Sequence, residues 1–282
     1  MKISLILATI NRIHEPYEFL ENLTWSNKDI SVEIIIVDQN INIDLNFEKY
    51  KYFDIKHIKI KEKGLSRARN IGLNFVTGDI IGFPDDDCYY SPNLLDVVGS
   101  LFKNQNIKCL QLPIFSSQNK NKKVARNWPD KSIELNFFNS LMYTASAGLF
   151  IKSDLIEKKF NELFGAGSKY GSCEDPLFIF DNIYKQKIKV YYYNLKNGIF
   201  HPENDQVNFN KIHSYNLGHV FFWKYIYNNS KIINKIQLIA FIIISFMYHI
   251  FQLLIKNNKE DKKYHWFVIK DRIKLLFNYG VN

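Results

Sequence analysis

Short apolar runs alternate with helix-like segments along most of this chain, and the alternation restricts the fold more than any other feature of the sequence. Apolar runs of this kind indicate strands that are buried on both faces of a parallel sheet. Four of them lie early in the chain, over Ile3–Ala8, Val32–Val37, Ile55–Ile60 and Asp79–Phe83. The sequence therefore predicts an α/β fold with a mostly parallel, Rossmann-like sheet flanked by helices, in which ligands bind at the carboxyl ends of the strands.

The segments between the apolar runs predict helices and one long loop. The clearest helix covers Ser66–Phe75, and Ser91 and Pro92 have the residue types of a cap and a first turn for a second helix that runs to about Lys103. The polar stretch Phe115–Asn136 is expected to be an irregular loop over a site. Further strands are expected over three later segments, Ile107–Leu112, Ser146–Ile151 and Ile188–Tyr193.

Charge is distributed unevenly, and this predicts a chain of two parts. The net charge is +9, but the residues from Lys211 onward carry 11 basic and 3 acidic groups, which leaves 26 basic and 25 acidic groups for the first 210 residues. We therefore predict an α/β domain over residues 1–210 and a basic, aromatic, helical tail over residues 211–282. The chain has no RNA-recognition signature, zinc finger or evident recognition helix, so no nucleic acid partner is expected.

Cysteine usage and the N-terminal residues indicate a cytoplasmic protein. Cys88, Cys109 and Cys173 are far apart and form neither a metal-spaced pair nor a redox pair, as is natural in a reducing compartment. The apolar run that follows Lys2 is short, and charged residues follow it where a signal peptide has its cleavage site. We interpret this run as a first strand and expect no export.

Three consecutive carboxylates, Asp85, Asp86 and Asp87, follow the buried run Ile80–Phe83. Like charges in a partly desolvated place repel one another, and a cation offsets that cost. A hard divalent ion held by oxygen ligands together with substrate phosphates fits this need. Taken alone, the triplet is better explained as a solvated acidic turn after a strand, and the other features of the chain reverse that preference.

Other polar side chains are expected at the same edge of the sheet. Those that follow the first and second strands are Thr9, Asn11, Arg12 and Asp38. Arg67 and Arg69 lie at the start of a helix, whose N-terminus favours an anion. Together these groups suit a nucleotide diphosphate, although each alone is explained as a turn or a solvated helix face. No glycine-rich dinucleotide loop or Walker A loop follows the first strand, which argues against a dinucleotide oxidoreductase or a P-loop ATPase.

Several motifs follow one another in a distinctive order. They are Ile6–Arg12, Ile35–Asp38, Gly64–Gly72, Gly78–Asp87, Phe164–Gly167, Gly171–Asp175 and His201. A single motif of this kind is weak, but the ordered series is specific. Over roughly residues 1–205 the chain thereby resembles family 2 glycosyltransferases with the GT-A (nucleotide-diphospho-sugar transferase) fold. The resemblance implies an inverting transfer of a sugar from a nucleotide donor to an acceptor.

The resemblance also implies roles on the donor side. Asp38 is expected to contact the base, Arg69 and Arg67 the donor, and Asp85 the nucleotide or sugar. The whole expected donor-binding set is Thr9, Asn11, Arg12, Asp38, Arg67, Arg69, Asp85 and Asp86. The chain departs from many relatives in the pair Gln39-Asn40, which follows Asp38, and this leaves the base and ribose contacts open.

The resemblance assigns the chemistry to four further residues. Displacement at an anomeric carbon needs a base for the acceptor proton and a cation for the leaving diphosphate. Asp175 is the expected base with Glu174 as the next candidate, while Asp87 and His201 are expected to ligate Mn²⁺ or Mg²⁺. Two alternatives remain open, namely Asp175 as a helix cap before Pro176 and His201 as a buried, hydrogen-bonded histidine. Three preceding glycines favour the base, because they allow close backbone approach to a ligand.

The tail contains one segment, Ile236–Ile255, that has no charged residue and is long enough to span a bilayer. Its polar residues and the lysine that follows it fall on one side of the predicted helix, and they are Gln237, Ser245, His249, Gln252 and Lys256. Flanking lysines and aromatic residues suit a helix in the interface of an anionic membrane, paired with the basic segment Trp266–Phe277. An interfacial or re-entrant helix is the first interpretation, a helix packed on the catalytic domain is the second and a membrane span is the third.

These inferences predict a metal-dependent, inverting glycosyltransferase that is peripherally associated with the cytoplasmic face of the cell membrane. The expected donor is a nucleotide-diphosphate sugar, with a UDP-sugar first, and the expected acceptor is a glycan or a lipid-linked glycan of a surface polysaccharide such as capsule, O-antigen or exopolysaccharide. One alternative is a nucleotidyltransferase, which would have a glycine-rich phosphate loop after the first strand. The other is a non-catalytic, membrane-attached subunit that binds sugar nucleotides.

Overall fold

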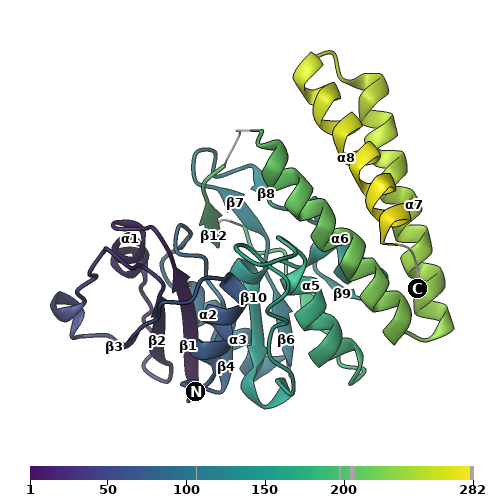
Figure 1. The fold of residues 1–282 in the computed structure, drawn as a ribbon. Helices are drawn as coiled ribbons and strands as arrows, with labels where there is room; N and C mark the ends of the chain where they lie inside the picture. The colour runs from purple at the N-terminus through teal and green to yellow at the C-terminus, as the bar shows by residue number, and fades with distance from the viewer. Residues whose placement is uncertain (106, 197, 204–206, 280–282) are drawn as a thin grey trace.

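An eight-stranded sheet forms the body of the protein (Figure 1). The computed structural model describes residues 1–105, 107–196, 198–203 and 207–279. The strands of this sheet, in spatial order, are β3 (Asp54–Lys59), β2 (Ser31–Asp38), β1 (Lys2–Thr9), β4 (Ile80–Gly82), β10 (Leu149–Lys152), β6 (Cys109–Gln111), β11 (Val190–Tyr192) and β9 (Ile133–Leu135). β1 and β2 are buried along almost their whole length, because the sheet is covered on both faces.

The strand directions largely agree with the prediction. Four of the seven described strand pairs are parallel, namely β1–β2, β1–β4, β2–β3 and β6–β11. β10 runs antiparallel to both of its neighbours, β4 and β6, and β9 runs antiparallel to β11. The apolar run that forms β10 resembles the other runs, and strand direction depends on the path of the chain between strands, so the sequence pattern does not reveal this reversal.

A second sheet brings one distant residue to the edge of the first. Its strands, in spatial order, are β5 (Tyr89–Tyr90), β12 (Ile199–His201), β7 (Ile114–Ser116) and β8 (Lys123–Val124). Because Phe200 pairs with Tyr89, two residues after Asp87, the strand β12 carries His201 next to the acidic triplet. This sheet also occupies part of the stretch Phe115–Asn136, so the prediction of an irregular loop was wrong in part. Strands of two or three residues are too short to leave a periodic pattern and form only where a partner strand exists.

Helices connect and cover the strands. They are α1 (Glu15–Asn22), α2 (Leu65–Leu73), α3 (Leu94–Asn104), α4 (Phe137–Tyr143), α5 (Glu174–Ile179), α6 (Phe209–Asn229), α7 (Ile232–Ile255) and α8 (Lys259–Asn278). The expected start of α3 was wrong, because its N-cap is Asn93 with a left-handed φ of 61°. Ser91 instead donates its backbone N–H to the carbonyl oxygen of Gly198, which immediately precedes β12.

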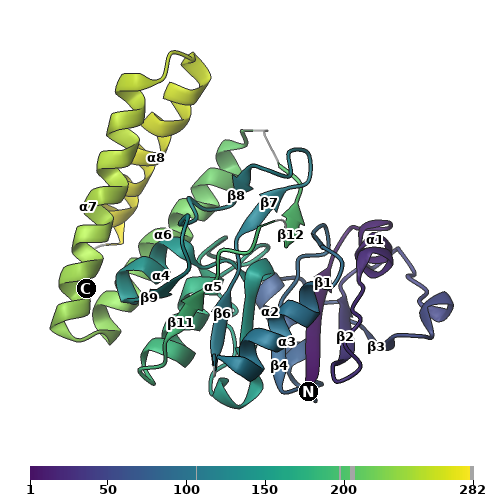
Figure 2. The ribbon, with the colours of Figure 1, turned by 180° about the vertical axis from the view of Figure 1, so that it is seen from behind.

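The tail helices α6, α7 and α8 share a hydrophobic core with the α/β part of the chain. Leu177 and Phe180, from α5 and the π-helical turn that continues it, lie in one buried cluster with Trp223, Leu238 and Leu275 of the three tail helices. Figures 1 and 2 show α7 and α8 side by side as an outer layer, on the far side of the molecule from β3. The expected pairing of the tail segments is therefore confirmed, and so is packing of α7 against the rest of the chain.

The polar side of α7 faces its partner helix. Ser245 accepts a hydrogen bond from Arg272 of α8 at 2.9 Å, and His249 Nδ1 lies 2.8 Å from His265 Nδ1. By length and composition α7 is able to cross a membrane, and 11% of its most apolar window is buried. Ser245 and His249 of the polar stripe thus stabilise a helix pair. The exposed residues of α7 are on its apolar side.

Candidate functional site

The predicted polar residues meet where β1, β2 and β4 end. Thr9 at the end of β1 pairs with Asp38 at the end of β2, and Ala8 bridges to Asp85, just after β4. The hydroxyl of Thr9 donates a hydrogen bond to Asp86 at 2.7 Å. The parallel register of three strands therefore brings these side chains to one edge, as the sequence predicted.

Asp87 lies between two basic side chains. His201 Nε2 is 3.1 Å from one carboxylate oxygen, and Arg12 Nη2 is 2.8 Å from the other. The second ring nitrogen of His201 lies 2.7 Å from the backbone oxygen of Pro202, so the ring is held with Nε2 toward Asp87. Burial lowers the pKa of His201, but the hydrogen bond to Asp87 and the charges of Asp87 and Asp85 outweigh it and raise the pKa to about 9. Burial raises the pKa of Asp87, but His201 and Arg12 hold it below its usual value.

The other two carboxylates of the triplet are shifted in the opposite direction. Burial raises the pKa of Asp86 to about 6, against the hydrogen bond from Thr9 that lowers it. Burial also raises the pKa of Asp85, although the Arg69 guanidinium opposes the shift. Repulsion from Asp87 adds to both increases. A cation at this edge would reduce the repulsion among the three carboxylates. The same repulsion was the reason for predicting a metal from the sequence.

Arg69 links the triplet to the predicted base. Its side chain is 1% exposed and donates to Asp85 and Asp175 at 3.1 Å each, and to the hydroxyl of Ser146 at 2.7 Å. Its guanidinium also lies over the ring of Phe160, with 5.5 Å between Cζ and the ring centroid. Arg69 therefore holds two carboxylates of the candidate site in place. The donor contact that was expected of it stays a prediction.

Asp175 lies in the first turn of α5 and is not its cap. The N-cap is Cys173 with a left-handed φ of 69°, so the alternative of Asp175 as a capping residue was wrong. One oxygen of Asp175 accepts the hydrogen bond from Arg69, and the other accepts the backbone N–H of Ser146 at 2.8 Å. Burial raises the pKa of the neighbouring Glu174, and the charge of Asp175 adds to this increase.

The segment before α5 covers the start of α2. The backbone N–H of Leu65 donates to Ala166, and Gly165 has a φ of +101° in this turn. One backbone N–H of the α2 N-terminus, which was expected to favour an anion, is thus bonded to the chain itself. Gly171 is needed for a similar reason, because an added Cβ would lie 2.1 Å from the hydroxyl oxygen of Ser214 on α6. These glycines allow one part of the chain to approach another closely.

Two further predicted residues have partners of their own. Arg67 is exposed and donates to Glu162 at 2.8 Å, so it does not join Arg69 in the cluster. Asp38 is fully buried, accepts the backbone N–H of Asn40 at 2.8 Å and lies 3.1 Å from His57 Nε2.

Asn40 connects the ends of the first two strands. Its side-chain oxygen accepts the backbone N–H of Asn11 at 2.5 Å, and Asn11 has a left-handed φ of 56°. Asn40, which marked a departure from many relatives in sequence, therefore fixes the loop that carries Asn11 and Arg12.

The donor set fits a hard divalent ion with few protein ligands. Asp85 Oδ2 and Asp87 Oδ1 lie 3.9 and 3.1 Å from His201 Nε2. The two carboxylates suit Mn²⁺ or Mg²⁺, and His201 would have to lose its Nε2 proton before it could join them as a ligand. Within the described ranges, no three His, Cys, Asp or Glu side chains are arranged to hold an ion by themselves. Mg²⁺ typically takes one or two carboxylates and completes its shell with substrate phosphates and water, so the arrangement is compatible with an ion that arrives with its substrate.

Ser146 and His57 are site residues that the sequence reasoning missed. Ser146 holds both Asp175 and Arg69, and His57 holds Asp38. Neither belongs to one of the motifs, and each reaches the site only because its strand or turn lies beside another in the sheet. A run of small residues before β10 was the only local signal for Ser146.

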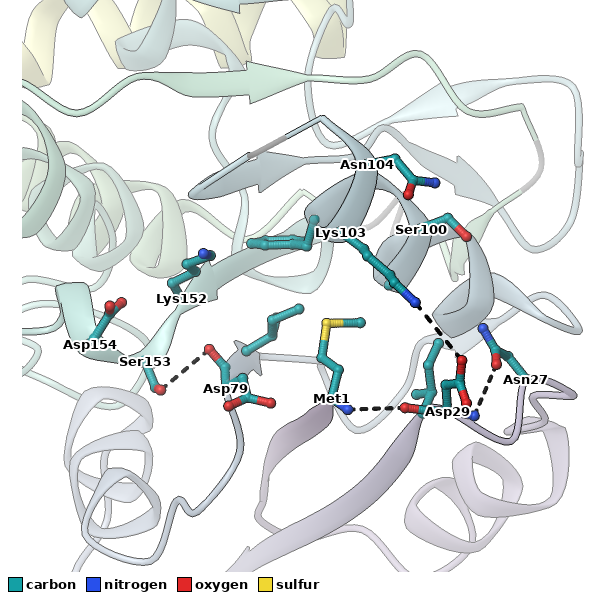
Figure 3. A pocket seen from close by; sticks show the side chains of 14 residues that line it. Met1, Asn27, Asp29, Asp79, Ser100, Lys103, Asn104, Lys152, Ser153 and Asp154 are labelled. Atoms are coloured by element: carbon teal, nitrogen blue, oxygen red, sulfur yellow. Dashed lines mark hydrogen bonds and ion pairs between the residues drawn. The ribbon is translucent and has the colours of Figure 1, made fainter.

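A cavity lies at the opposite edge of the sheet. It has a volume of about 890 Å³ and is lined by side chains that include Met1, Asp29, Asp79, Lys103 and Lys152 (Figure 3). Met1 and Asp79 immediately precede β1 and β4, whereas the acidic triplet follows β4. This cavity is therefore separate from the cluster around Asp87 and Asp175.

Comparison with known sequences gives a match over the first part of the chain. A sequence model of the family described as "Glycosyl transferase family 2" matches residues 4–158. A protein of Pyrococcus furiosus named dolichol-phosphate mannosyltransferase is 29% identical over 134 residues, which are 46% of this chain and 36% of that protein. An uncharacterized glycosyltransferase of Bacillus subtilis, YwdF, is 30% identical over 123 residues, or 43% of this chain and 46% of that protein. The matches thus span less than half the length of these relatives.

Comparison with solved structures covers nearly the whole chain. A fragment of S. aureus TarS in complex with UDP-GlcNAc superposes with a TM-score of 0.66 at 16% identity, over 97% of this chain and 81% of that one. A mannosyltransferase from Pyrobaculum calidifontis in complex with GDP-Man and Mn²⁺ gives 0.65 at 12% identity, over 99% and 88%. At such low identity the likeness establishes a shared fold.

Proposed function

This chain belongs to glycosyl transferase family 2 and has the GT-A fold, and we propose that it transfers a sugar from a nucleotide-diphosphate donor to a glycan or lipid-linked acceptor. The main support for this proposal is the position of Arg69. Arg69 joins Asp85 of the acidic triplet to Asp175, so that the carboxylates we propose for cation binding and for the base lie at one edge of the sheet. The family match ends at residue 158, before Asp175 and His201, so their roles rest on this geometry.

For the donor we propose a UDP-sugar held at the ends of β1 and β2. The buried Asp38 is proposed to meet the base, with Thr9, Asn11 and Arg12 beside it. The two solved neighbours are complexes with UDP-GlcNAc and with GDP-Man, and the first of these supports UDP as the nucleotide to test first. His57 would act through Asp38, because its ring holds the carboxylate in a fixed orientation.

For the metal we propose Mn²⁺ or Mg²⁺ held by Asp87 and His201. When bound, the ion supplies positive charge for the leaving diphosphate. Asp85 and Asp86 add negative charge to the same edge. Burial is the main cause of their raised pKa values, and repulsion from Asp87 adds to it. The mannosyltransferase neighbour is a complex with Mn²⁺, which supports a divalent ion in this fold.

For the chemistry we propose a single displacement that inverts the anomeric centre. The acceptor hydroxyl oxygen forms a bond to the anomeric carbon while the bond from that carbon to the diphosphate breaks, and Asp175 takes the hydroxyl proton. Arg69 and the Ser146 amide fix the orientation of Asp175, and each carboxylate oxygen keeps a further lone pair for that proton. Glu174 is the second candidate for the base.

For the setting we propose surface polysaccharide synthesis at the cytoplasmic face of the cell membrane. The Pyrococcus furiosus relative is named for dolichol phosphate, which supports a lipid-linked acceptor. Two other functions remain to be tested against this one, namely a nucleotidyltransferase and a non-catalytic subunit that binds sugar nucleotides.

A panel of nucleotide sugars tests the proposal, with release of nucleoside diphosphate as the measurement. We expect release that depends on Mn²⁺ or Mg²⁺, stops with chelator and is lost in Asp175→Asn. Release of pyrophosphate from a nucleoside triphosphate and a sugar phosphate would instead indicate the nucleotidyltransferase. Binding without turnover across the whole panel and a panel of acceptor glycans would indicate the non-catalytic subunit.

A further inference from the structure

Twelve of the 25 exposed large apolar side chains in the described part of the protein lie on the outward face of α7. Every exposed residue of α7 is isoleucine, leucine, methionine, phenylalanine, alanine or tyrosine. Those along the middle of the face follow helical spacing and include Ile236, Ile243, Met247 and Leu254, which are 57%, 56%, 58% and 77% exposed. A continuous apolar face of this kind on a folded protein marks a surface that another body covers.

Contacts on the other side of α7 fix this orientation. Arg272 of α8 donates to Ser245, His249 meets His265, and the ring of Phe241 packs edge-on against Phe138 of α4 at 6.1 Å between centroids. Rotating α7 to bury its apolar face would expose these contacts and leave polar groups unpaired. The apolar face is therefore a fixed feature of the fold.

The exposed face of α8 carries lysines and aromatic residues together. Trp266 and Phe277 are 59% and 83% exposed, and Ile273 lies between them at 41%. Lysines share this face with them at helical spacing, and they are Lys259, Lys262, Lys263, Lys270 and Lys274. Two more exposed lysines, Lys231 and Lys256, stand at the two ends of α7. The apolar face is thus bordered by positive charge and by large aromatic rings.

We propose that α7 and α8 form a docking surface for the headgroup region of an anionic membrane, with both helices lying parallel to the bilayer plane. The apolar side chains of α7 enter the acyl boundary, while the α8 lysines contact lipid phosphates and its aromatic rings lie at the same level. This proposal specifies how the protein would reach the membrane location given in the proposed function, and it does not depend on the sugar chemistry.

The turn between α7 and α8 lies at the same end of the molecule as β7 and β12 in Figures 1 and 2, and β12 carries His201.

Two other arrangements fit the structure less well. If α7 crossed the bilayer, α8 beside it would carry Lys263, Lys270 and Lys274 into hydrocarbon, where charged side chains are strongly disfavoured. If a second copy of the chain covered the face, the lysine-rich borders of two hairpins would be brought together, and like charges would repel. An anionic lipid surface would bury the apolar face and would also attract the lysines that border it.

Sedimentation with lipid vesicles tests the proposal on the full chain. We expect binding to phosphatidylcholine vesicles that contain phosphatidylglycerol, weaker binding to phosphatidylcholine alone, and partial loss in high salt, which screens only the charges. Exchanging the four central residues, as Ile236→Gln, Ile243→Gln, Met247→Gln and Leu254→Gln, should weaken vesicle binding by about a hundredfold. A matched control exchanges exposed apolar residues elsewhere, Ile41→Gln and Leu163→Gln, and should bind like the wild type.

Three results would overturn the proposal. The first is no binding to vesicles of either kind, or equal binding by the face variant and the wild type. The second is a wild-type dimer in light scattering that the face variant converts to a monomer while vesicle binding is absent. The third is retention of the protein in membranes after alkaline carbonate extraction, which would indicate a span. Metal-dependent donor hydrolysis in solution, measured in parallel, reports on the proposed enzyme independently of the membrane.

Discussion

The guanidinium of Arg69 donates from Nη1 to Oδ1 of Asp175 over 3.1 Å, and this bond joins α2 to α5. The other terminal nitrogen of Arg69 reaches Asp85 over the same distance. A buried cation between two carboxylates lowers the repulsion between them and fixes their positions. The geometry of the candidate site therefore depends on a residue that has almost no contact with solvent.

Replacing Arg69 should destabilise the fold. Arg69→Gln leaves Asp85 and Asp175 without their common partner, and loss of one member of a buried ion pair costs about 3–5 kcal/mol. Urea unfolding measures the change. Arg67→Gln is the matched control on the same helix, since Arg67 is exposed and its pair with Glu162 contributes at most about 1 kcal/mol. Equal effects of the two variants would contradict the role given to Arg69.

Replacing Asp175 should affect turnover and leave donor binding intact. Asp175→Asn keeps an oxygen for the Ser146 amide but removes the base, so we expect turnover to fall by about 10²–10⁴-fold. Because the helix cap is Cys173, loss of capping cannot account for such a fall. Calorimetry with the nucleotide diphosphate measures donor affinity in the same variant. Normal turnover in Asp175→Asn would transfer the role to Glu174, and Glu174→Gln tests that directly.

Two substitutions around Asp87 should change metal affinity in opposite directions. Asp87→Asn removes a proposed ligand and should weaken Mn²⁺ binding to the free protein. Arg12→Gln removes a cation 2.8 Å from the same carboxylate and should strengthen it by about three- to tenfold, because a half-exposed pair of this kind contributes about 1 kcal/mol. Electron paramagnetic resonance of free Mn²⁺ measures both. Unchanged affinity in Asp87→Asn would remove this residue from the metal site.

The pH dependence of stability should contain a contribution from Glu33, a buried carboxylate on β2. Burial raises its pKa, but hydrogen bonds from Lys2, Ser4 and Thr77 outweigh this and lower the pKa from 4.5 to about 2. Because the pKa is lower in the folded state, the stabilisation is complete above pH 4.5 and is lost as the pH falls toward 2. Its size is on the order of 3 kcal/mol.

Urea unfolding between neutral and acidic pH measures this contribution. Glu33→Gln should be less stable at neutral pH and should lose less stability on acidification than the wild type. The exposed Glu48→Gln serves as control and should follow the wild type. Parallel curves for Glu33→Gln and the wild type would show that Glu33 carries no such linkage.

Much of the site could be predicted because strand ends are local features. The runs that form β1, β2 and β4 are apolar enough to be recognised as buried, and in a parallel sheet their carboxyl ends share one edge. The sequence pattern alone therefore places Thr9, Asp38 and Asp85 together. The partners of Asp175 were not predictable, because the Ser146 amide and the Arg69 guanidinium reach it only through packing of α2, α5 and the start of β10.

Sequence by itself determined the family, the α/β class and the carboxylates at the strand ends, since periodicity and motif order are properties of the chain alone. Only the tertiary structure decided which side of each element faces inward. The polar stripe of α7 was visible in the sequence, but the choice between water and α8 as its neighbour depended on Arg272 and His265. Likewise Arg67 and Arg69 are equivalent in sequence, and burial made one of them a surface pair and the other the centre of the site. The burial and the partners of a side chain depend on segments that are distant in sequence, so a local sequence pattern does not reveal them.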